Sequence, residues 1–181
     1  MFNIEILKDS QIIKKLNIER YAYIITYLPK TNISENPEFQ KVYNYFFKVR
    51  RNEQWRKVYF DIMERAKTNE LSFRDIITEI YKKTGRIEAS FSSKLLASIN
   101  PTKPIWDHFV LKNLNIKPTG KTPVERIENA CQIYNVLVKW YDEFIKTDEG
   151  KKYILEFDKY LPNYAWISNI KKLDFLIWST R

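Results

Sequence analysis

A chain of 181 residues has the length of one domain and is long enough to bury a hydrophobic core. Its hydrophobic (44%) and aromatic (15%) contents exclude an intrinsically disordered chain, and three glycines are too few for the many turns of a β-sandwich. Basic residues number 31 against 22 acidic ones, and the resulting net charge of +9 favours a polyanionic partner, although a composition rich in Lys, Ile, Asn and Tyr contributes to it.

Hydrophobic residues at three- and four-residue spacing predict helices throughout the first half of the chain. Two short helical faces come first, Ile12, Ile13 and Leu16 and then Tyr23–Leu28, and they end at Pro29. Asn36-Pro37-Glu38 is a typical helix start, with proline at the first helical position. Asn52 is predicted to cap the next helix, and a helix from Ser72 is predicted to stop at Thr84-Gly85. A basic corner, Lys48-Val49-Arg50-Arg51, separates the helices that follow Asn36 and Asn52.

The second half of the chain continues this pattern. Ser90 or Ser92 is predicted to cap a helix that ends before Asn100-Pro101, and Asp107 to cap a short helix over His108–Leu114. Further helices are predicted over residues 124–145, 151–160 and 168–178. We therefore expect an all-α fold: a compact multi-helix domain over residues 1–181 with about eight to ten helices and candidate sub-lobes 1–84 and 85–181.

The single cysteine and the single histidine limit the available chemistry. Cys131 has no disulfide partner within the chain, and together with His108 it does not make a zinc site, so we expect no metal and no cofactor. The sequence has no apolar run of transmembrane length and no signal-peptide pattern. These features predict a cytoplasmic protein without a membrane partner.

Cations and small hydroxyl side chains gather around the predicted turn at Gly85. Backbone N–H groups at a helix start, with hydroxyls and cations nearby, are typical of an anion-binding site. The alternative is that the serines only cap the helix and the lysines only complement the dipole of the helix before them. The candidate DNA-binding residues on the first interpretation are Lys82, Lys83, Arg86, Ser90, Ser92, Ser93 and Lys103.

The residues that follow this turn resemble a known protein family. The segment Phe91-Ser-Ser-Lys-Leu-Leu through Asn100-Pro101, then Pro104-Ile105-Trp106-Asp107-His-Phe-Val110, resembles the core of the helix-hairpin-helix DNA glycosylase superfamily. It is more particularly similar to bacterial proteins described as 8-oxoguanine-glycosylase-like. In that superfamily a glycine hairpin and a helix are followed by Pro-x-x-Asp-x-x-Val, and this aspartate is the catalytic carboxylate. The resemblance covers residues 91–110.

The resemblance implies a function for several of these residues. Asp107 would stabilise the cationic sugar that forms when the bond to a flipped base breaks, with duplex DNA as the partner. Trp106 and His108 would border the base pocket. Members with lyase activity carry a nucleophilic lysine at the position that corresponds to Glu88 or Ala89 here, so Lys94 is the nearest lysine that could substitute.

The resemblance also extends to two further places. The Gly-x-Gly turn of the superfamily is reduced to Thr84-Gly85-Arg86, so DNA contact would depend on Lys and Arg side chains. The C-terminal stretch Ile170–Trp178 resembles the end of the same bacterial proteins. We interpret that stretch as a packing helix with Lys171 and Lys172 solvated or touching DNA.

Three functions are consistent with these patterns. The first is a DNA N-glycosylase that releases a damaged or modified base by hydrolysis, with lyase activity depending on Lys94. The second is a catalytically inactive module that binds DNA or a modified base. The third is a helical protein-interaction factor, for example in phage–host conflict, whose positive charge comes from composition. Fold alone does not distinguish them.

Overall fold

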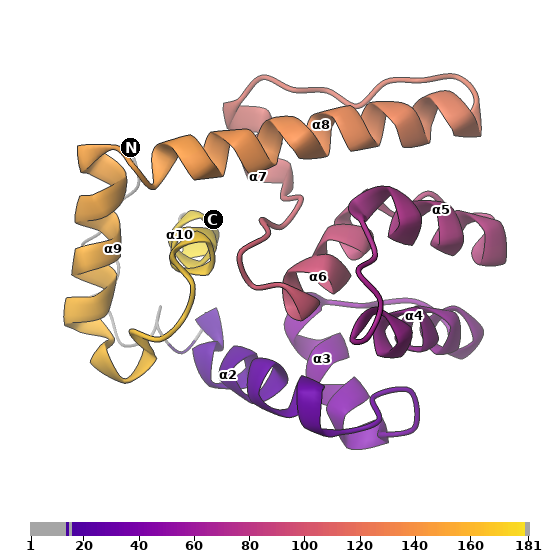
Figure 1. Cartoon of the computed structure of the whole chain (residues 1–181), viewed down its shortest axis with the longest axis horizontal. Coiled ribbons are helices and arrows are strands. Elements are labelled where there is room, and N and C mark those ends of the chain that lie inside the picture. Colours follow the sequence, from indigo (N-terminus) through magenta and orange to yellow (C-terminus); the bar gives the residue numbers. More distant parts are fainter. Residues whose placement is uncertain (1–13, 15, 180–181) are drawn as a thin grey trace.

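The computed structural model describes residue 14 and residues 16–179, and this part of the chain forms nine α-helices and two short 3-10 helices without a β-strand (Figure 1). The all-α prediction is therefore confirmed. Ile12 and Ile13 of the first predicted helical face lie outside the described residues. None of the described helices has the length and apolar character needed to cross a bilayer. The elements are α2 (Ile18–Tyr27), η2 (Leu28–Lys30), α3 (Pro37–Phe47), α4 (Glu53–Ala66), α5 (Phe73–Thr84), α6 (Ala89–Ile99), α7 (His108–Asn113), α8 (Pro123–Phe144), α9 (Asp148–Tyr160), η3 (Pro162–Tyr164) and α10 (Asn169–Ser179).

Polar side chains begin several of these helices where the sequence predicts them. Asn36 and Asn52 each accept a hydrogen bond at 2.9 Å from the backbone N–H three residues later. Ser72 forms a reciprocal capping box at the start of α5. The prediction for α9 was wrong by three residues, because Thr147 caps it and the helix begins at Asp148.

The start of α6 also differs from the prediction. Neither Ser90 nor Ser92 caps this helix: it begins at Ala89, after Glu88, and no side chain caps it. The Ser92 hydroxyl instead donates to the Glu88 carbonyl oxygen at 2.9 Å, back along the same helix. The Ser92 hydroxyl thus has an acceptor, but the backbone N–H groups at the start of α6 receive no side-chain cap.

Helix α10 lies inside the molecule. Figure 1 shows it end-on, surrounded by α8, α9, α2 and the connection between α6 and α7. Every residue from Ile170 to Ile177 is buried. Phe175 contacts Tyr21 of α2 in an edge-to-face arrangement with ring centroids 5.5 Å apart. Because neighbours cover α10 on all sides, it has no solvent-facing side for its lysines.

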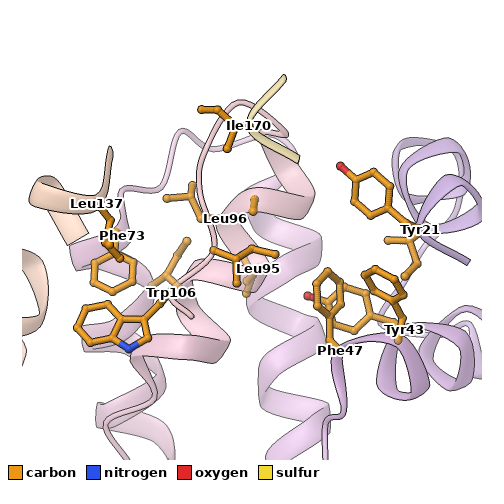
Figure 2. Close-up of a cluster of buried hydrophobic side chains, with 14 of the residues drawn as sticks. Tyr21, Tyr43, Phe47, Phe73, Leu95, Leu96, Trp106, Leu137 and Ile170 are labelled. Atoms are coloured by element: carbon orange, nitrogen blue, oxygen red, sulfur yellow. The ribbon is translucent and has the colours of Figure 1, made fainter. Parts of the chain in front are cut away.

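The hydrophobic core runs across α6 and fixes the hairpin that α6 forms with α5. Figure 2 shows Leu95 and Leu96 between two aromatic groups, Phe73 and Trp106 on one side and Tyr43 and Phe47 on the other. Aromatic side chains in such clusters bury large apolar areas and dominate the energy of a core. The α5–α6 hairpin is therefore held against α3, α4 and α8 together.

Candidate functional site

The α5–α6 hairpin carries exposed basic residues at its turn. Gly85 adopts a left-handed conformation (φ 70°), which allows the chain to leave α5 and reverse. Lys82, Lys83 and Arg86 are exposed around it. The Lys83 ammonium pairs with Glu79 at 3.0 Å, one helical turn earlier. The structure thus brings together three of the predicted DNA-binding cations on one surface.

The other predicted DNA-binding residues lie elsewhere. Ser92 and Ser93 are fully buried, and their hydroxyls donate to carbonyl oxygens of the first turn of α6. Ser90 is partly buried near the same turn. Lys103 follows α6 at its opposite end and lines a groove of about 840 Å³ beside the C-terminal part of α4. Of these four residues only Ser90 lies with the hairpin cations.

The connection between α6 and α7 is fixed by two hydrogen bonds just before Asp107. The Trp106 backbone N–H donates to the Ser93 hydroxyl at 2.8 Å, and the Tyr134 hydroxyl donates to the Pro104 carbonyl at 2.9 Å. The Trp106 ring lies parallel to Phe73, with centroids 6.4 Å apart. These contacts hold the buried segment Pro104–Trp106 in place ahead of the aspartate.

Asp107 begins α7, as the sequence predicts, and is almost fully buried. Its Oδ1 atom accepts a hydrogen bond from the Phe109 backbone N–H at 2.8 Å, and 9% of the residue is exposed. A carboxylate at this position also interacts favourably with the positive end of the helix dipole. The hydrogen bond from Phe109 therefore fixes the Asp107 carboxylate at the start of α7.

A cavity of about 380 Å³ adjoins Asp107. Trp106 and His108, the two residues predicted to border a base pocket, both line it, and Ser90 lies on its hairpin side. Lys112 and Lys117 contribute positive charge to its wall. Asp107 stands between Trp106 and His108 in the chain but is not among the residues that line this cavity.

Lys94 and Glu88 have clear structural partners. The Lys94 ammonium donates to the Phe47 carbonyl oxygen at 3.1 Å, at the end of α3, and lies 4.9 Å from the centroid of the Phe91 ring. The Glu88 carboxylate, at the position where the resemblance would place a lysine, accepts hydrogen bonds from Arg51 at 2.9 and 3.1 Å and from Arg86 at 3.2 Å. These contacts hold Lys94 toward α3 and make Glu88 an anchor for two arginines.

The sequence interpretation of Lys171 and Lys172 was wrong. Only 2% and 3% of these residues are exposed, so neither is solvated nor able to touch DNA. Lys172 pairs with Asp158 of α9 at 2.6 Å, and Lys171 lies 3.6 Å from Asp174. The ammonium of Lys171 is also 3.9 Å from the ring centroid of Trp178. The sequence did offer one signal: six of the nine residues from Ile170 to Trp178 are apolar, which leaves little room for a solvent-facing side.

Asp174 belongs to a buried polar cluster with Lys171, Tyr141 and, at longer range, Asp107. The Tyr141 hydroxyl donates to Asp174 Oδ1 at 2.7 Å. Burial raises the pKa of Asp174 to about 6, against the opposing effects of Lys171 and the Tyr141 hydrogen bond, and the charge of Asp107 raises it further. Burial and the nearby carboxylates likewise raise the pKa of Tyr141 well above its usual value. Sequence reasoning missed this cluster because its members come from three distant segments.

Comparison with protein-family models, with curated proteins and with solved structures gave no match, so the residues and their geometry carry the functional argument for this chain.

Proposed function

We propose that the chain binds duplex DNA through the α5–α6 hairpin and releases a damaged or modified base by hydrolysis of its N-glycosidic bond. The observation that supports this most is the order of elements: a basic hairpin, its second helix, a rigid connection, and then Asp107 fixed at the start of α7. This arrangement agrees with the resemblance of residues 91–110 to the helix-hairpin-helix glycosylases.

The reaction would use the charge of Asp107. As the bond between the sugar C1′ and the base breaks, the base leaves with the bonding electrons and the sugar becomes cationic. A fixed carboxylate near C1′ stabilises this cation more than it stabilises the neutral ground state, which lowers the barrier. Water then adds to C1′, its proton passes to solvent or to the departing base, and an abasic sugar remains.

The flipped base would enter the cavity beside Trp106 and His108. Its volume of about 380 Å³ lies within the range of small-molecule sites, and its aromatic and basic lining suits an electron-rich ring. We do not expect a lysine of this chain to cleave the DNA strand. Lys94 is held by the carbonyl of Phe47, and Glu88 is held by two arginines. We therefore expect a monofunctional enzyme.

The alternative of an inactive DNA-binding module is favoured by one observation. Asp107 serves as a helix cap and does not line the cavity of Trp106 and His108, so a purely structural role also accounts for its position. The two proposals share the DNA-binding surface and differ only in chemistry. The third alternative, a protein-interaction factor, lacks DNA affinity altogether.

Base release from a panel of duplexes, each with one damaged or modified base, tests the proposal. The variant Asp107→Asn suits this test because asparagine caps helices about as well as aspartate does, so the fold and the cap remain while the charge is lost. We expect base release to fall by a factor of about 100 or more, as for removal of one stabilising group in other enzymes. Asp142→Asn, at an exposed position of α8, is the matched control.

The outcomes separate the three functions. Equal base release by wild type and Asp107→Asn would refute the mechanism. Salt-dependent duplex binding without base release on any substrate of the panel would support the inactive module, and no binding even at low salt would leave the interaction factor. A borohydride-trapped adduct that Lys94→Ala abolishes would contradict the monofunctional assignment.

A further inference from the structure

The basic corner of the sequence, Lys48–Arg51, lies next to the hairpin turn although more than 30 residues separate them. Between them is a pocket of about 420 Å³. Arg50 and Arg51 line it from the connection between α3 and α4, Trp55 lines it from the first turns of α4, and Lys83 and Arg86 line it from the hairpin. Four cations thus surround one pocket, and no acidic side chain is among the described residues that line it.

Glu88, which does not line the pocket, positions Arg51 and Arg86. Its side chain is only 10% exposed, and it holds Arg51 through two hydrogen bonds and Arg86 through one. A guanidinium group carries five N–H donors, so both arginines keep donors that Glu88 does not use. Arg51 and Arg86 share the single negative charge of Glu88, so these three side chains together have a net charge of +1. Within the described chain Arg50 makes no ion pair, and it adds a second positive charge.

Trp55 also lines this pocket, and its indole N–H lacks a protein acceptor. It is 5% exposed, and its indole Nε1 has no hydrogen-bond partner among the described residues. A buried donor without an acceptor costs free energy, and such groups are rare in folded proteins. The indole is stacked on Tyr59, with centroids 5.0 Å apart, and little of its surface is exposed, so a stacked base is not the expected ligand there. The four cationic side chains that line the pocket favour an oxyanion instead.

We infer that this pocket binds a phosphate group, and that Arg50 and Arg51 extend the DNA-binding surface from the hairpin to the corner between α3 and α4. The net charge of the walls and the planar guanidinium donors match the charge and geometry of phosphate oxygens. The inference deepens the proposed function, because it rests on the DNA-binding part of that proposal and is independent of base excision. Arg50 is not part of the hairpin, so its substitution tests this inference separately from DNA binding by the hairpin.

Fluorescence anisotropy of a labelled duplex tests the inference in the intact chain. Arg50→Gln should weaken binding about tenfold, the loss expected for one charge-assisted contact. It should also reduce the slope of log K against log[salt] by about 1. The matched control is Arg74→Gln, which removes the same charge from the other end of α5, about 15 Å away along the helix, where Arg74 is exposed and paired with Glu128. The control should bind like wild type.

A second measurement uses the phosphate chemistry alone. Titration with inorganic pyrophosphate should shift the Trp55 indole ¹H–¹⁵N resonance, assigned with Trp55→Phe, in a saturable manner that Arg50→Gln abolishes. If wild type binds duplex and Arg50→Gln binds equally well, the inference is overturned while the DNA proposal stands. If duplex does not bind but pyrophosphate does, the pocket stands and the DNA partner is refuted. Absence of both signals overturns both.

Discussion

The buried pair of Lys171 and Asp174 gives a prediction in which two electrostatic effects oppose each other. Attraction at 3.6 Å favours the ionised carboxylate, whereas removal from water disfavours it. Asp174 is 1% exposed, and its pKa rises from 3.8 to about 6, so desolvation is the larger effect. This rise means that the ionised form costs about 3 kcal/mol in the folded state.

The raised pKa of Asp174 sets the sign with which the stability of the fold depends on pH. Because the pKa of Asp174 is higher in the folded than in the unfolded chain, the folded state binds the extra proton between about pH 4 and 6. Below this range the carboxyl is neutral in both states and the penalty is absent. The stability that this group contributes is therefore present at low pH and is lost as pH rises through about 6.

The perturbation is Asp174→Asn, which resembles the neutral carboxyl in shape and keeps an oxygen for the Tyr141 hydroxyl. The free energy of unfolding from urea titrations at pH 4, 5, 6, 7 and 8 is the measurement. We expect Asp174→Asn to come closest to wild type near pH 4, to exceed it by about half of the full difference near pH 5, and to exceed it by up to about 3 kcal/mol at pH 8. The control Asp142→Asn, at an exposed site, should show a difference that does not change with pH.

The opposite result would refute this reasoning. If attraction to Lys171 outweighed desolvation, Asp174→Asn would leave a buried cation without its partner and destabilise the protein by about 3 to 5 kcal/mol at pH 8. A difference from wild type that stayed constant between pH 5 and 8 would likewise contradict the assigned rise in the pKa of Asp174.

Two further predictions concern the core and the backbone. Gly150→Ala would place a Cβ atom 2.0 Å from the Phe144 carbonyl oxygen, so the start of α9 must shift and we expect thermal unfolding at a clearly lower temperature. Gly85→Ala meets no atom within 4 Å and should cost only about 1 kcal/mol for its positive φ, and equal losses for both variants would contradict this account. Tyr43→Phe removes the buried hydroxyl that lies 2.9 Å from the Tyr59 hydroxyl and should cost about 1 kcal/mol in urea unfolding. No loss in that variant would show that the pair adds nothing net.

Local signals predicted the starts of α3, α4 and α7 correctly, whereas they missed those of α6 and α9 and the environment of α10. Asn36, Asn52 and Asp107 cap helices because the required acceptor and N–H groups lie within three residues of each other. Lys171 and Lys172 read as surface residues because lysine is rarely buried without a partner. The partner of Lys172 is Asp158, on another helix, and sequence periodicity does not reveal such a pairing.

Local sequence signals likewise predict one part of the candidate site and miss another. The position of Asp107 at the start of α7 follows from a short pattern around Pro104, and the sequence predicts it. The phosphate pocket depends on α4 and α5, which bring Arg50 next to Arg86 across more than 30 residues, so neither half predicts the other. Ser92 and Ser93 were expected at the surface, but the α6–α7 connection folds back over them.

In the proposed mechanism, the charge of Asp107 promotes base release from DNA bound to the hairpin. Single-turnover base release, measured with wild type and Asp107→Asn at enzyme concentrations that saturate the same duplex, tests it most directly. We expect equal duplex affinity and a rate at least about 100-fold lower for the variant. Equal rates at equal affinity would contradict it.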